Sequence, residues 1–421
     1  MEKRKLIEMG TLSRGRSQHR PRNDSKLYGG KYPFIQTGDV KNSNLYIEKY
    51  SQTYNDFGLN QSKLWPENTL CITIAANIAD TGILSFPACF PDSIIGFTAT
   101  KGKTDVRYVK YCFDLLQKSI QNMSKGSTQD NLSMEKLEQL EFNCPSFENQ
   151  QKIAAVLSSL DDKIALNNRI NAKLEQMAKR LYDYWFVQFD FPNADGKPYK
   201  SNGGKMVWNE ELKREIPEGW EVKKISEILD CEIPGDWGEE EIKGNHKYKV
   251  NCIRGCDMVD MTDLPVRYIL ESNSKKLLQK DDFVIEISGG SPTQSTGRIV
   301  QITDEIIKRF NGKIICSNFC HGIRLNDKDY ASYFFQMWNM FYLNNIFFNY
   351  EGKTSGLKNF QFDTFVSETW YVPPKELVRK YHEVVSKFRK QIDINESETQ
   401  KLTVLRDRLL PLLMNGQVEV K

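Results

Sequence analysis

The sequence predicts an α+β fold in which two similar mixed α/β domains alternate with two long helices that pair as a coiled coil. Three observations predict this fold: an internal repeat, two long helical stretches with matching apolar spacing, and strand-like segments ahead of each stretch. Residues 145–185 align without gaps on residues 373–413, and the identical pairs include Pro145 with Pro373 and Asn167 with Asn395. A self-match of this length indicates a duplication.

Both repeated stretches are expected to be long helices that begin after a proline, which interrupts the preceding structure. Apolar side chains recur at alternating intervals of four and three residues, and this 3.5-residue period is typical of a coiled-coil seam. A polar residue near the middle of each seam lowers stability but penalises wrong registers. The alternative is two ordinary amphipathic helices in one core. The residues predicted to pair the helices are Ile153, Leu157, Leu160, Ile164, Asn167, Leu174, Leu181, Val385, Phe388, Ile392, Asn395, Leu402 and Leu409.

Strand-like segments precede each helix, and they also match between the halves. Residues 70–75, followed by Thr81-Gly82-Ile83, parallel residues 283–288, followed by Thr296-Gly297-Arg298-Ile299. These stretches are rich in β-branched residues and are bounded by Gly, Asn and Pro, which predicts strands and turns. The predicted boundaries are 1–144 for the first domain, 145–190 for the first long helix, 191–215 for a connector, 216–372 for the second domain and 373–421 for the second long helix.

Composition excludes some classes of protein but does not name a partner. The 58 basic and 55 acidic residues give a net charge of only +3, although residues 1–31 hold nine basic residues against three acidic ones. No run of 18 apolar residues occurs, which excludes a spanning helix. Residues 1–10 lack the apolar core of a secretory signal. Nine dispersed cysteines are expected to stay reduced, as in the cytoplasm.

Motifs of catalysis are missing from the sequence, so no catalytic residue is predicted. Gly102-Lys103-Thr104 resembles the end of a phosphate-binding loop, but the upstream Gly96 stands at the wrong spacing. Dinucleotide fingerprints, nucleophile elbows, zinc-protease helices and the Asn-Pro-Pro-Tyr type of tetrapeptide do not occur either. Two pairs of cysteines could ligate zinc, although packed thiols are the commoner alternative. The pairs are Cys252 with Cys256 and Cys316 with Cys320.

Features typical of nucleic-acid binding are better represented. In residues 10–22, arginines alternate with small polar residues, and guanidinium groups bind both phosphates and guanine edges. Residues 288–298 combine glycines with hydroxyl and amide side chains, and the turns at 125–129 and 352–359 carry similar donors in both copies. A solvated arm and a polar hairpin loop are the structural alternatives. The residues expected to bind nucleic acid are Arg14, Arg16, Arg20, Arg22, Lys31, Lys125, Thr128, Gln129, Arg254, Ser291, Gln294, Ser295, Arg298, Lys353 and Asn359.

Residues 145–154, at the start of the first predicted helix, read Pro-Ser-Phe-Glu-Asn-Gln-Gln-Lys-Ile-Ala. This stretch is similar to the Pro-x-x-x-Glu-Gln-x-x-Ile-Ala opening of the first central helix in a known family, and the chain thereby resembles the specificity subunit (HsdS) of type I restriction-modification enzymes. Residues 32–40, the turn at 126–132 and Ile216-Pro-Glu-Gly-Trp220 are also family-like. The second helix departs from the pattern at residues 377–381, and the family's DNA-reading residues vary too much to transfer.

The resemblance implies two target-recognition domains separated by two long antiparallel helices, arranged as a pseudo-twofold repeat. Each domain would read one half of a bipartite DNA site, and the helical spacer would set the gap. A helix of about 40 residues spans about 60 Å, more than one DNA turn of about 34 Å. The implied partners are double-stranded DNA, two modification (methyltransferase) subunits and two restriction (translocase/endonuclease) subunits. S-adenosylmethionine, ATP and Mg would bind those subunits, so this chain would be non-catalytic.

Two other functions stay open at this point. One is a DNA methyltransferase or nuclease with an unrecognised active site, and the other is a protein-only scaffold built on the coiled coil. Turnover of S-adenosylmethionine by the isolated chain would favour the first, and sequence-specific retention of DNA would exclude the second. Leu166, Ile170 and Ile394 lie off the predicted seam and are candidates for contacts with modification subunits, or for ordinary core. The recognised bases are not predicted.

Overall fold

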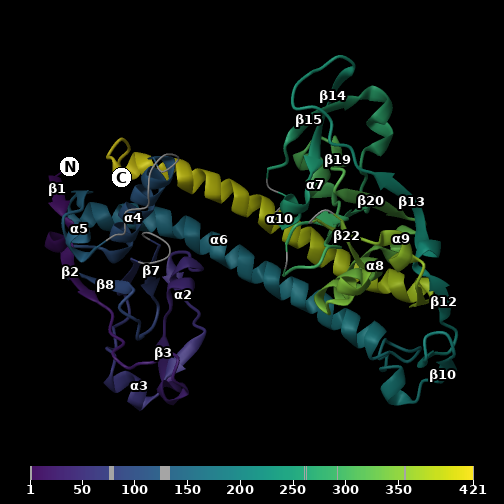
Figure 1. Ribbon diagram of the computed structural model, residues 1–421, viewed down its shortest axis with the longest axis horizontal. Coiled ribbons are helices and arrows are strands. Elements are labelled where there is room, and N and C mark those ends of the chain that lie inside the picture. The colour runs from purple at the N-terminus through teal and green to yellow at the C-terminus, as the bar shows by residue number, and fades with distance from the viewer. Residues whose placement is uncertain are drawn as a thin grey trace. The chain divides into compact units, whose positions relative to one another are not determined.

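The computed structural model describes residues 2–74, 80–123, 133–259, 261, 263–291, 293–354 and 357–420. The chain divides into two compact units (Figure 1). Unit 1 comprises Met1–Asn167 together with Glu398–Lys421, and unit 2 comprises Asn168–Ser397. Both long helices therefore contribute one part to each unit. None of the helices in the described ranges is long and apolar enough to cross a membrane.

Unit 1 is built on a five-stranded sheet with the order β2-β8-β6-β7-β4. Along β6 the side chains alternate between two cores, because successive residues of a strand point to opposite faces. Leu70 and Ile72 join the core that contains α4, and Cys71 joins a second core around Trp65. The elements are β2 (Gly10–Arg14), β4 (Tyr46–Ile47), β6 (Leu70–Thr73), β7 (Thr81–Leu84), β8 (Ile94–Ala99) and α4 (Val106–Met123).

A separate two-stranded antiparallel sheet of β3 and β5 carries an aromatic cluster in unit 1. The rings of Phe34 and Tyr54 are both buried and stack with their centroids 4.1 Å apart. Such rings contribute a large apolar area, which holds this small sheet together. The elements here are η1 (Ser25–Leu27), β3 (Tyr28–Phe34), α2 (Thr37–Lys41), β5 (Gln52–Tyr54) and α3 (Asp56–Asn60).

The first and last strands of the globular part of unit 1, β1 and β9, pair antiparallel and close it. The start of α6 and the end of α10 then join the main core, where Ile153 and Leu157 share a cluster with Leu410 and Leu413. The elements are β1 (Glu2–Lys5), α1 (Leu6–Met9), α5 (Met134–Glu138), β9 (Glu141–Cys144), α6 (Phe147–Tyr182) and α10 (Lys375–Met414).

Unit 2 contains a four-stranded sheet with the order β13-β20-β16-β18. Its aromatic helix α8 covers the sheet, since Phe334 and Trp338 share a core with Phe283 and Ile285 of β16. β12 and β23 pair antiparallel, as β1 and β9 do in unit 1. The elements are β12 (Glu221–Lys224), η4 (Ile225–Ile228), β13 (Leu229–Pro234), β16 (Phe283–Glu286), β18 (Ile299–Gln301), β20 (Cys320–Leu325), α8 (Ala331–Leu343), α9 (Phe362–Val366) and β23 (Thr369–Val372).

Two further three-stranded sheets belong to unit 2, with the orders β15-β14-β19 and β17-β22-β21. The second brings residues 288–289 together with residues 351–354 and 357–360, although they are far apart in the sequence. The remaining elements are η2 (Asp183–Val187), η5 (Gly255–Val259), β14 (His246–Ile253), β15 (Val266–Leu270), η6 (Glu271–Lys276), β17 (Ser288–Gly289), α7 (Asp304–Arg309), β19 (Ile314–Cys316), η7 (Lys328–Tyr330), η8 (Ile346–Tyr350), β21 (Glu351–Thr354) and β22 (Leu357–Phe360).

The two units repeat one plan, element by element. In chain order, β1, α1, β2, β6, β7, β8, α4, α5 and β9 of unit 1 match β12, η4, β13, β16, β18, β20, α8, α9 and β23 of unit 2. Even the first turn is the same, because the N–H of Lys5 donates to Glu8 and the N–H of Lys224 donates to Glu227, both at 2.9 Å. The predicted fold of two similar mixed α/β domains is confirmed.

Within each unit the long helices run antiparallel. In unit 1, Asp161 and Asn167 of α6 bond Arg406 and Glu398 of α10. In unit 2, Asn171 bonds Asn395, and the Ala178 carbonyl accepts from the hydroxyl of Tyr381. The residue numbers rise along α6 as those of the partners fall along α10, so the predicted antiparallel pair is present.

The stretch predicted as a connector, residues 191–215, is a folded part of unit 2. The ring of Phe191 stacks on Tyr199 at 4.6 Å and on Trp220 at 5.5 Å between centroids. Prolines and glycines suggested a linker, but Phe191 packs against the core of unit 2, and the burial of such a ring is favourable. The elements here are η3 (Lys200–Asn202), β10 (Met206–Asn209) and β11 (Arg214–Pro217).

Candidate nucleic-acid interface

The arginine-rich segment after β2 forms an ordered loop of unit 1. At Gly15 a Cβ would stand 2.2 Å from the Pro91 carbonyl oxygen, so this position requires glycine. The next residue, Arg16, donates its N–H to the carbonyl of Phe90 at 3.0 Å. Further along the loop, the Gln61 side chain accepts the N–H groups of Gln18 at 2.7 Å and His19 at 2.9 Å. The loop is thereby preorganised.

The four arginines of this segment serve different contacts. Arg20 donates to the carbonyls of Ser17 and His19 at 2.7 and 2.8 Å, so it stabilises its own loop. Nη2 of Arg22 donates to both carboxylate oxygens of Asp92, at 2.8 and 2.9 Å, and about half of the Arg22 side chain stays exposed. Arg16 bonds the Gln18 side chain, and Arg14 is exposed at the end of β2.

Of the four other DNA-binding residues predicted in the first half of the chain, the structure describes Lys31. Lys31 is exposed, with its ammonium group 5.2 Å from the ring centroid of Tyr32. Lys125, Thr128 and Gln129 lie outside the described residues.

In unit 2 the loop between β17 and β18 is tied to the hairpin of β21 and β22. Arg298 binds the buried carboxylate of Glu286 through two hydrogen bonds of 2.8 and 2.7 Å, which raise the pKa of the guanidinium group. The N–H of Thr296 donates to Glu351 at 2.7 Å, and Glu351 also pairs with Lys358 at 3.1 Å. Arg298 is thus part of the scaffold beneath the loop.

The tip of this loop is more accessible than its base. Gln294 is exposed and Ser291 is half-buried, whereas Ser295 is buried. Asn359 accepts the hydroxyl of Ser288, so the predicted loop and the predicted 352–359 turn form one surface. Lys353 lies in β21, but its side chain is outside the described residues.

Arg254 lies in another part of unit 2 and caps η5. Its Nε and Nη2 atoms donate to the Asp257 carboxylate at 2.8 and 2.7 Å, and this pairing raises the pKa of Arg254. Since 39% of its side chain is exposed, the guanidinium group is oriented by Asp257 rather than enclosed.

The structure reveals a correspondence that the sequence comparison missed. Gly235 and Asp236 of unit 2 occupy the places of Gly15 and Arg16, because a Cβ on Gly235 would meet the Ser317 carbonyl at 2.0 Å and Asp236 donates its N–H to Cys316 at 2.8 Å. Residues 15–24 carry three arginines and one aspartate, whereas residues 235–243 carry four acidic residues and one lysine. The equivalent arms therefore differ in charge.

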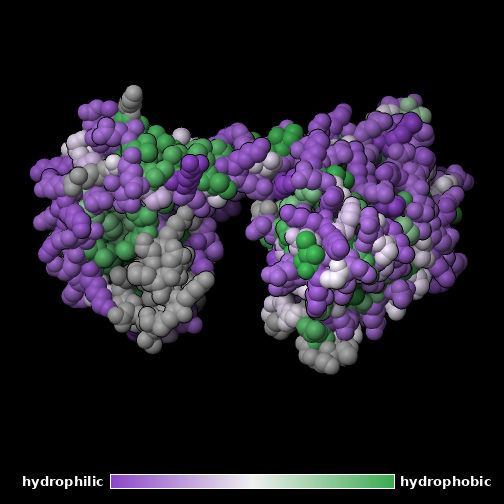
Figure 2. Space-filling model, turned by 90° about the horizontal axis from the view of Figure 1, so that it is seen from above, coloured by the Kyte–Doolittle hydropathy of each residue, from purple (hydrophilic) through white to green (hydrophobic). Residues whose placement is uncertain are grey.

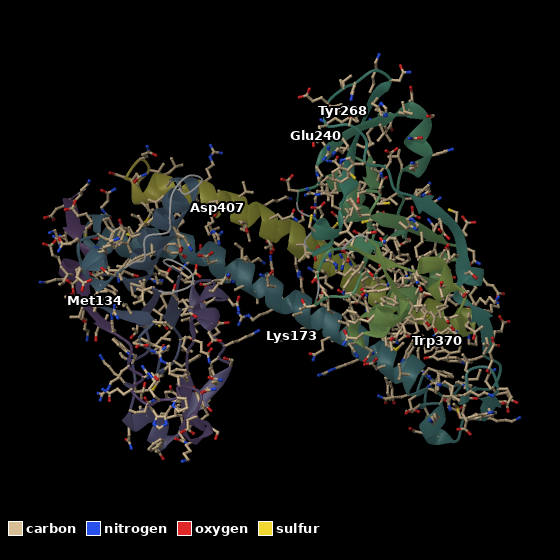
Figure 3. All side chains as sticks on the ribbon, viewed as in Figure 1. Met134, Lys173, Glu240, Tyr268, Trp370 and Asp407 are labelled. Carbon is tan, nitrogen blue, oxygen red and sulfur yellow. The ribbon has the colours of Figure 1, made fainter. Side chains whose placement is uncertain are left out.

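The acidic arm is held against β15 of unit 2. The backbones of Glu239 and Tyr268 exchange two hydrogen bonds of 2.9 Å, and Figure 3 labels Tyr268 beside Glu240. Arg267 pairs with Glu240 at 2.9 Å and lies 4.3 Å from the ring centroid of Trp237. In the sequence, the signal for the equivalence of the two arms is one shared glycine, Gly15 and Gly235. A single glycine is too weak a signal to reveal the equivalence without the backbone.

The cysteines of the two predicted pairs lie in different surroundings. Burial raises the pKa of Cys252 and of Cys320 to about 12, while Cys256 is exposed. Within the described ranges no group of three or more His, Cys, Asp or Glu side chains could hold a metal ion. These thiols are accounted for as packed or surface side chains.

The predicted helix-pairing residues line the inner faces of α6 and α10 to different degrees. Asn167 bonds Glu398 at 2.8 Å in unit 1, and Asn395 bonds Asn171 at 2.7 Å in unit 2, so both polar seam positions have polar partners. The buried members are Ile153, Leu157, Ile164, Asn167, Val385, Ile392 and Asn395, and the half-buried ones are Leu160, Leu174, Leu181, Phe388, Leu402 and Leu409.

The outer faces of the helices expose some apolar side chains. The surface in view is mostly hydrophilic with hydrophobic residues between (Figure 2). On α6 the exposed fractions are 43% for Leu166 and 50% for Met177. On α10 they are 42% for Ile394 and 69% for Val404. Ile170, the third off-seam residue of the sequence analysis, is half-buried.

Known proteins match the chain along nearly its whole length. The family model described as the type I restriction modification DNA specificity domain matches residues 1–176 and 217–404. The type I restriction enzyme MjaIX specificity subunit of Methanocaldococcus jannaschii is 27% identical over 99% of this chain and 93% of its own length. The type I restriction enzyme HindI specificity subunit of Haemophilus influenzae is 25% identical over 70% of this chain and 72% of its own. The solved S subunit of a type I restriction-modification system from M. genitalium has a TM-score of 0.62 at 17% identity, covering 98% of this chain and 96% of that chain, so the fold is shared.

Proposed function

The chain belongs to the family of the type I restriction modification DNA specificity domain, and from that premise we propose that it is a DNA sequence-specificity subunit that leaves all bond-making to companion subunits. Each unit reads one half of a bipartite DNA site. The observation that carries this proposal is that the family model matches both halves of a chain whose two units share one plan.

The candidate interface supports DNA as the ligand. Arg14, Arg16 and Arg22 are exposed on a preorganised loop of unit 1, where guanidinium groups can bind phosphates or guanine edges. Gln294 and Ser291 offer neutral donors and acceptors on the loop between β17 and β18 of unit 2. Because Arg20, Arg254 and Arg298 bind groups of their own unit, they act chiefly by orienting these surfaces.

The paired helices suit a spacer that fixes the gap between half-sites. An α-helix rises about 1.5 Å per residue, so the 40 residues of α10 make it long compared with one DNA turn of about 34 Å. Two modification subunits bind the exposed apolar residues of the helices, and two restriction subunits join the assembly. S-adenosylmethionine, ATP and Mg bind those subunits, and the assembly works in the cytoplasm, where the nine free thiols stay reduced.

Mapping of methylated adenines in genomic DNA tests the proposal. Cells that carry the complete system are compared with cells in which this chain alone is deleted. The expected result is one asymmetric two-part motif with a fixed gap, which disappears on deletion. Methylation that persists unchanged without the chain would contradict the proposal. In a second assay, the isolated chain is expected not to turn over S-adenosylmethionine, and robust turnover would favour the methyltransferase alternative.

A further inference from the structure

A cavity of about 270 Å³ opens in unit 1 beside the arginine loop. It lies between the loop, the β3–β5 sheet and the turn before β8, and it is lined by side chains from all three. Binding sites for drug-sized ligands are commonly about 300–1,000 Å³, so this cavity suits a ligand of one or two rings.

The lining combines aromatic rings with amide and hydroxyl groups. Phe34 and Tyr54 form a buried stacked pair at the back, and Tyr28 is half-buried with its ring centroid 5.2 Å from that of Tyr54. At the rim, the Gln36 amide donates to the Gln52 carbonyl oxygen at 2.7 Å. Aromatic rings stack on nucleobases, and side-chain amides hydrogen-bond to base edges.

The walls of the cavity are fixed before any ligand arrives. The hydroxyl of Tyr28 donates to the carbonyl of Arg22 at 2.7 Å, and Arg22 itself is held by Asp92. Ser17, only 5% exposed, lies with its hydroxyl 3.5 Å from that of Tyr54. A guanidinium group that can bind phosphate thus stands at the edge of a pocket suited to a base.

The equivalent sequence position in unit 2 carries a large ring. Ser17 follows Gly15 and Arg16 as Trp237 follows Gly235 and Asp236. The indole of Trp237 packs against the cluster that contains Val250 and Ile269 and under Arg267. The position two residues after the shared glycine therefore carries a small side chain in unit 1, where it lines the cavity, and a large ring in unit 2.

We propose that this cavity receives one unstacked nucleobase of the half-site that unit 1 reads, with Tyr28 stacking on the base and Gln36 and Gln52 bonding to its edge. The inference rests on the proposed function, since it assigns part of the DNA recognition to residues outside the arginine loop. Extruding a base from a duplex requires breaking its pair, and this step is easier where the pair is already mismatched.

A mismatch scan of the mapped DNA site tests the inference, using the full-length chain assembled with its companion subunits. A single mismatch is placed at each position of both half-sites, and affinity is measured at fixed salt. One position is expected at which the mismatch tightens binding by about tenfold, because the pair no longer has to be broken. A scan in which every mismatch weakens binding or leaves it unchanged would overturn the inference.

Two variants assign any tightening to the cavity. Ser17→Trp fills it with the residue that unit 2 uses, and Gln52→Leu, at an exposed rim position, removes the edge contact without a buried change. Both are expected to abolish the gain, whereas the matched control Gln279→Leu, exposed in unit 2, keeps it. A gain that survives in Gln52→Leu belongs to another site and overturns the inference, while specific binding of the perfect duplex would still support the proposed function.

Discussion

The buried polar network that joins α4, α6 and α10 in unit 1 is expected to be a main determinant of how the two long helices pair. Asp161 is 7% exposed and accepts from the Tyr111 hydroxyl at 2.6 Å and from Nη1 of Arg406 at 2.8 Å. Figure 3 labels Asp407, which neighbours Arg406 on α10 and pairs with it at 3.0 Å. Replacing Arg406 by leucine leaves the Asp161 carboxylate without its cation.

The magnitude follows from burial. Breaking a buried ion pair by removing one partner typically destabilises a protein by about 3–5 kcal/mol. Arg406 keeps 29% of its side chain exposed, so water screens part of the interaction and the expected loss for Arg406→Leu is about 2–3 kcal/mol. The pair of Lys163 with Glu398 is about half exposed on both sides, and such surface pairs contribute roughly 0–1 kcal/mol. Lys163→Leu is therefore the matched control.

Urea unfolding of the full-length chain measures both losses. The double variant Asp161→Leu with Arg406→Leu is expected to be more stable than Arg406→Leu alone, because no uncompensated carboxylate stays buried. Equal stability losses for Arg406→Leu and Lys163→Leu would refute the reasoning, as would a double variant that loses the sum of the two single losses.

Three further outcomes are expected. Arg14→Ala should lower the slope of log affinity for DNA against log salt concentration by about one unit, with the recognised sequence unchanged. An unaltered slope in binding titrations would show that Arg14 does not contact a phosphate. Seven residues inserted after Asn167 together with seven after Ser397 keep the seam in phase and lengthen the spacer by about 10.5 Å. Methylation mapping should then show a gap between half-sites that is wider by roughly three base pairs, at about 3.4 Å each. An unchanged gap would contradict the role of the helices as a spacer. Burial raises the pKa of Asp114, so the folded state binds this proton more tightly than the unfolded state, and stability falls as pH rises above about 4. In urea unfolding between pH 4 and 8, the stability of Asp114→Asn should therefore rise relative to that of the unchanged chain as the pH increases. A constant difference in stability would count against this reasoning.

The family and the plan of the fold could be predicted from the sequence because they rest on long, regular patterns. The 3.5-residue period of the helices and the motif at residues 145–154 are legible without coordinates, and the family resemblance is confirmed by the match over both halves. The equivalence of Gly15 and Gly235 was not legible, since it rests on backbone contacts with strands about 80 residues away. Single conformational constraints of this kind leave almost no pattern in a sequence.

The candidate site was predicted by residue type, and residue type does not say whether a charge faces solvent or a partner of its own. Arg14 and Arg298 look alike in sequence, yet Arg14 is exposed and Arg298 is bound to Glu286. Arg22 is the cavity residue that was predicted to bind DNA, whereas Gln36 and Gln52 were not predicted, because they come from different elements and carry no shared motif. Recognition surfaces assembled from several loops are the part of this molecule that needs coordinates.

The opposite charges of the two equivalent arms have a consequence for the first encounter with DNA. A polyanion accelerates toward positive potential and is repelled by negative potential, over distances set by the ionic strength. The charge of residues 15–24 favours the approach of a duplex, while that of residues 235–243 does not. We therefore expect a protein built on one repeated plan to meet the duplex first through unit 1 and then through unit 2.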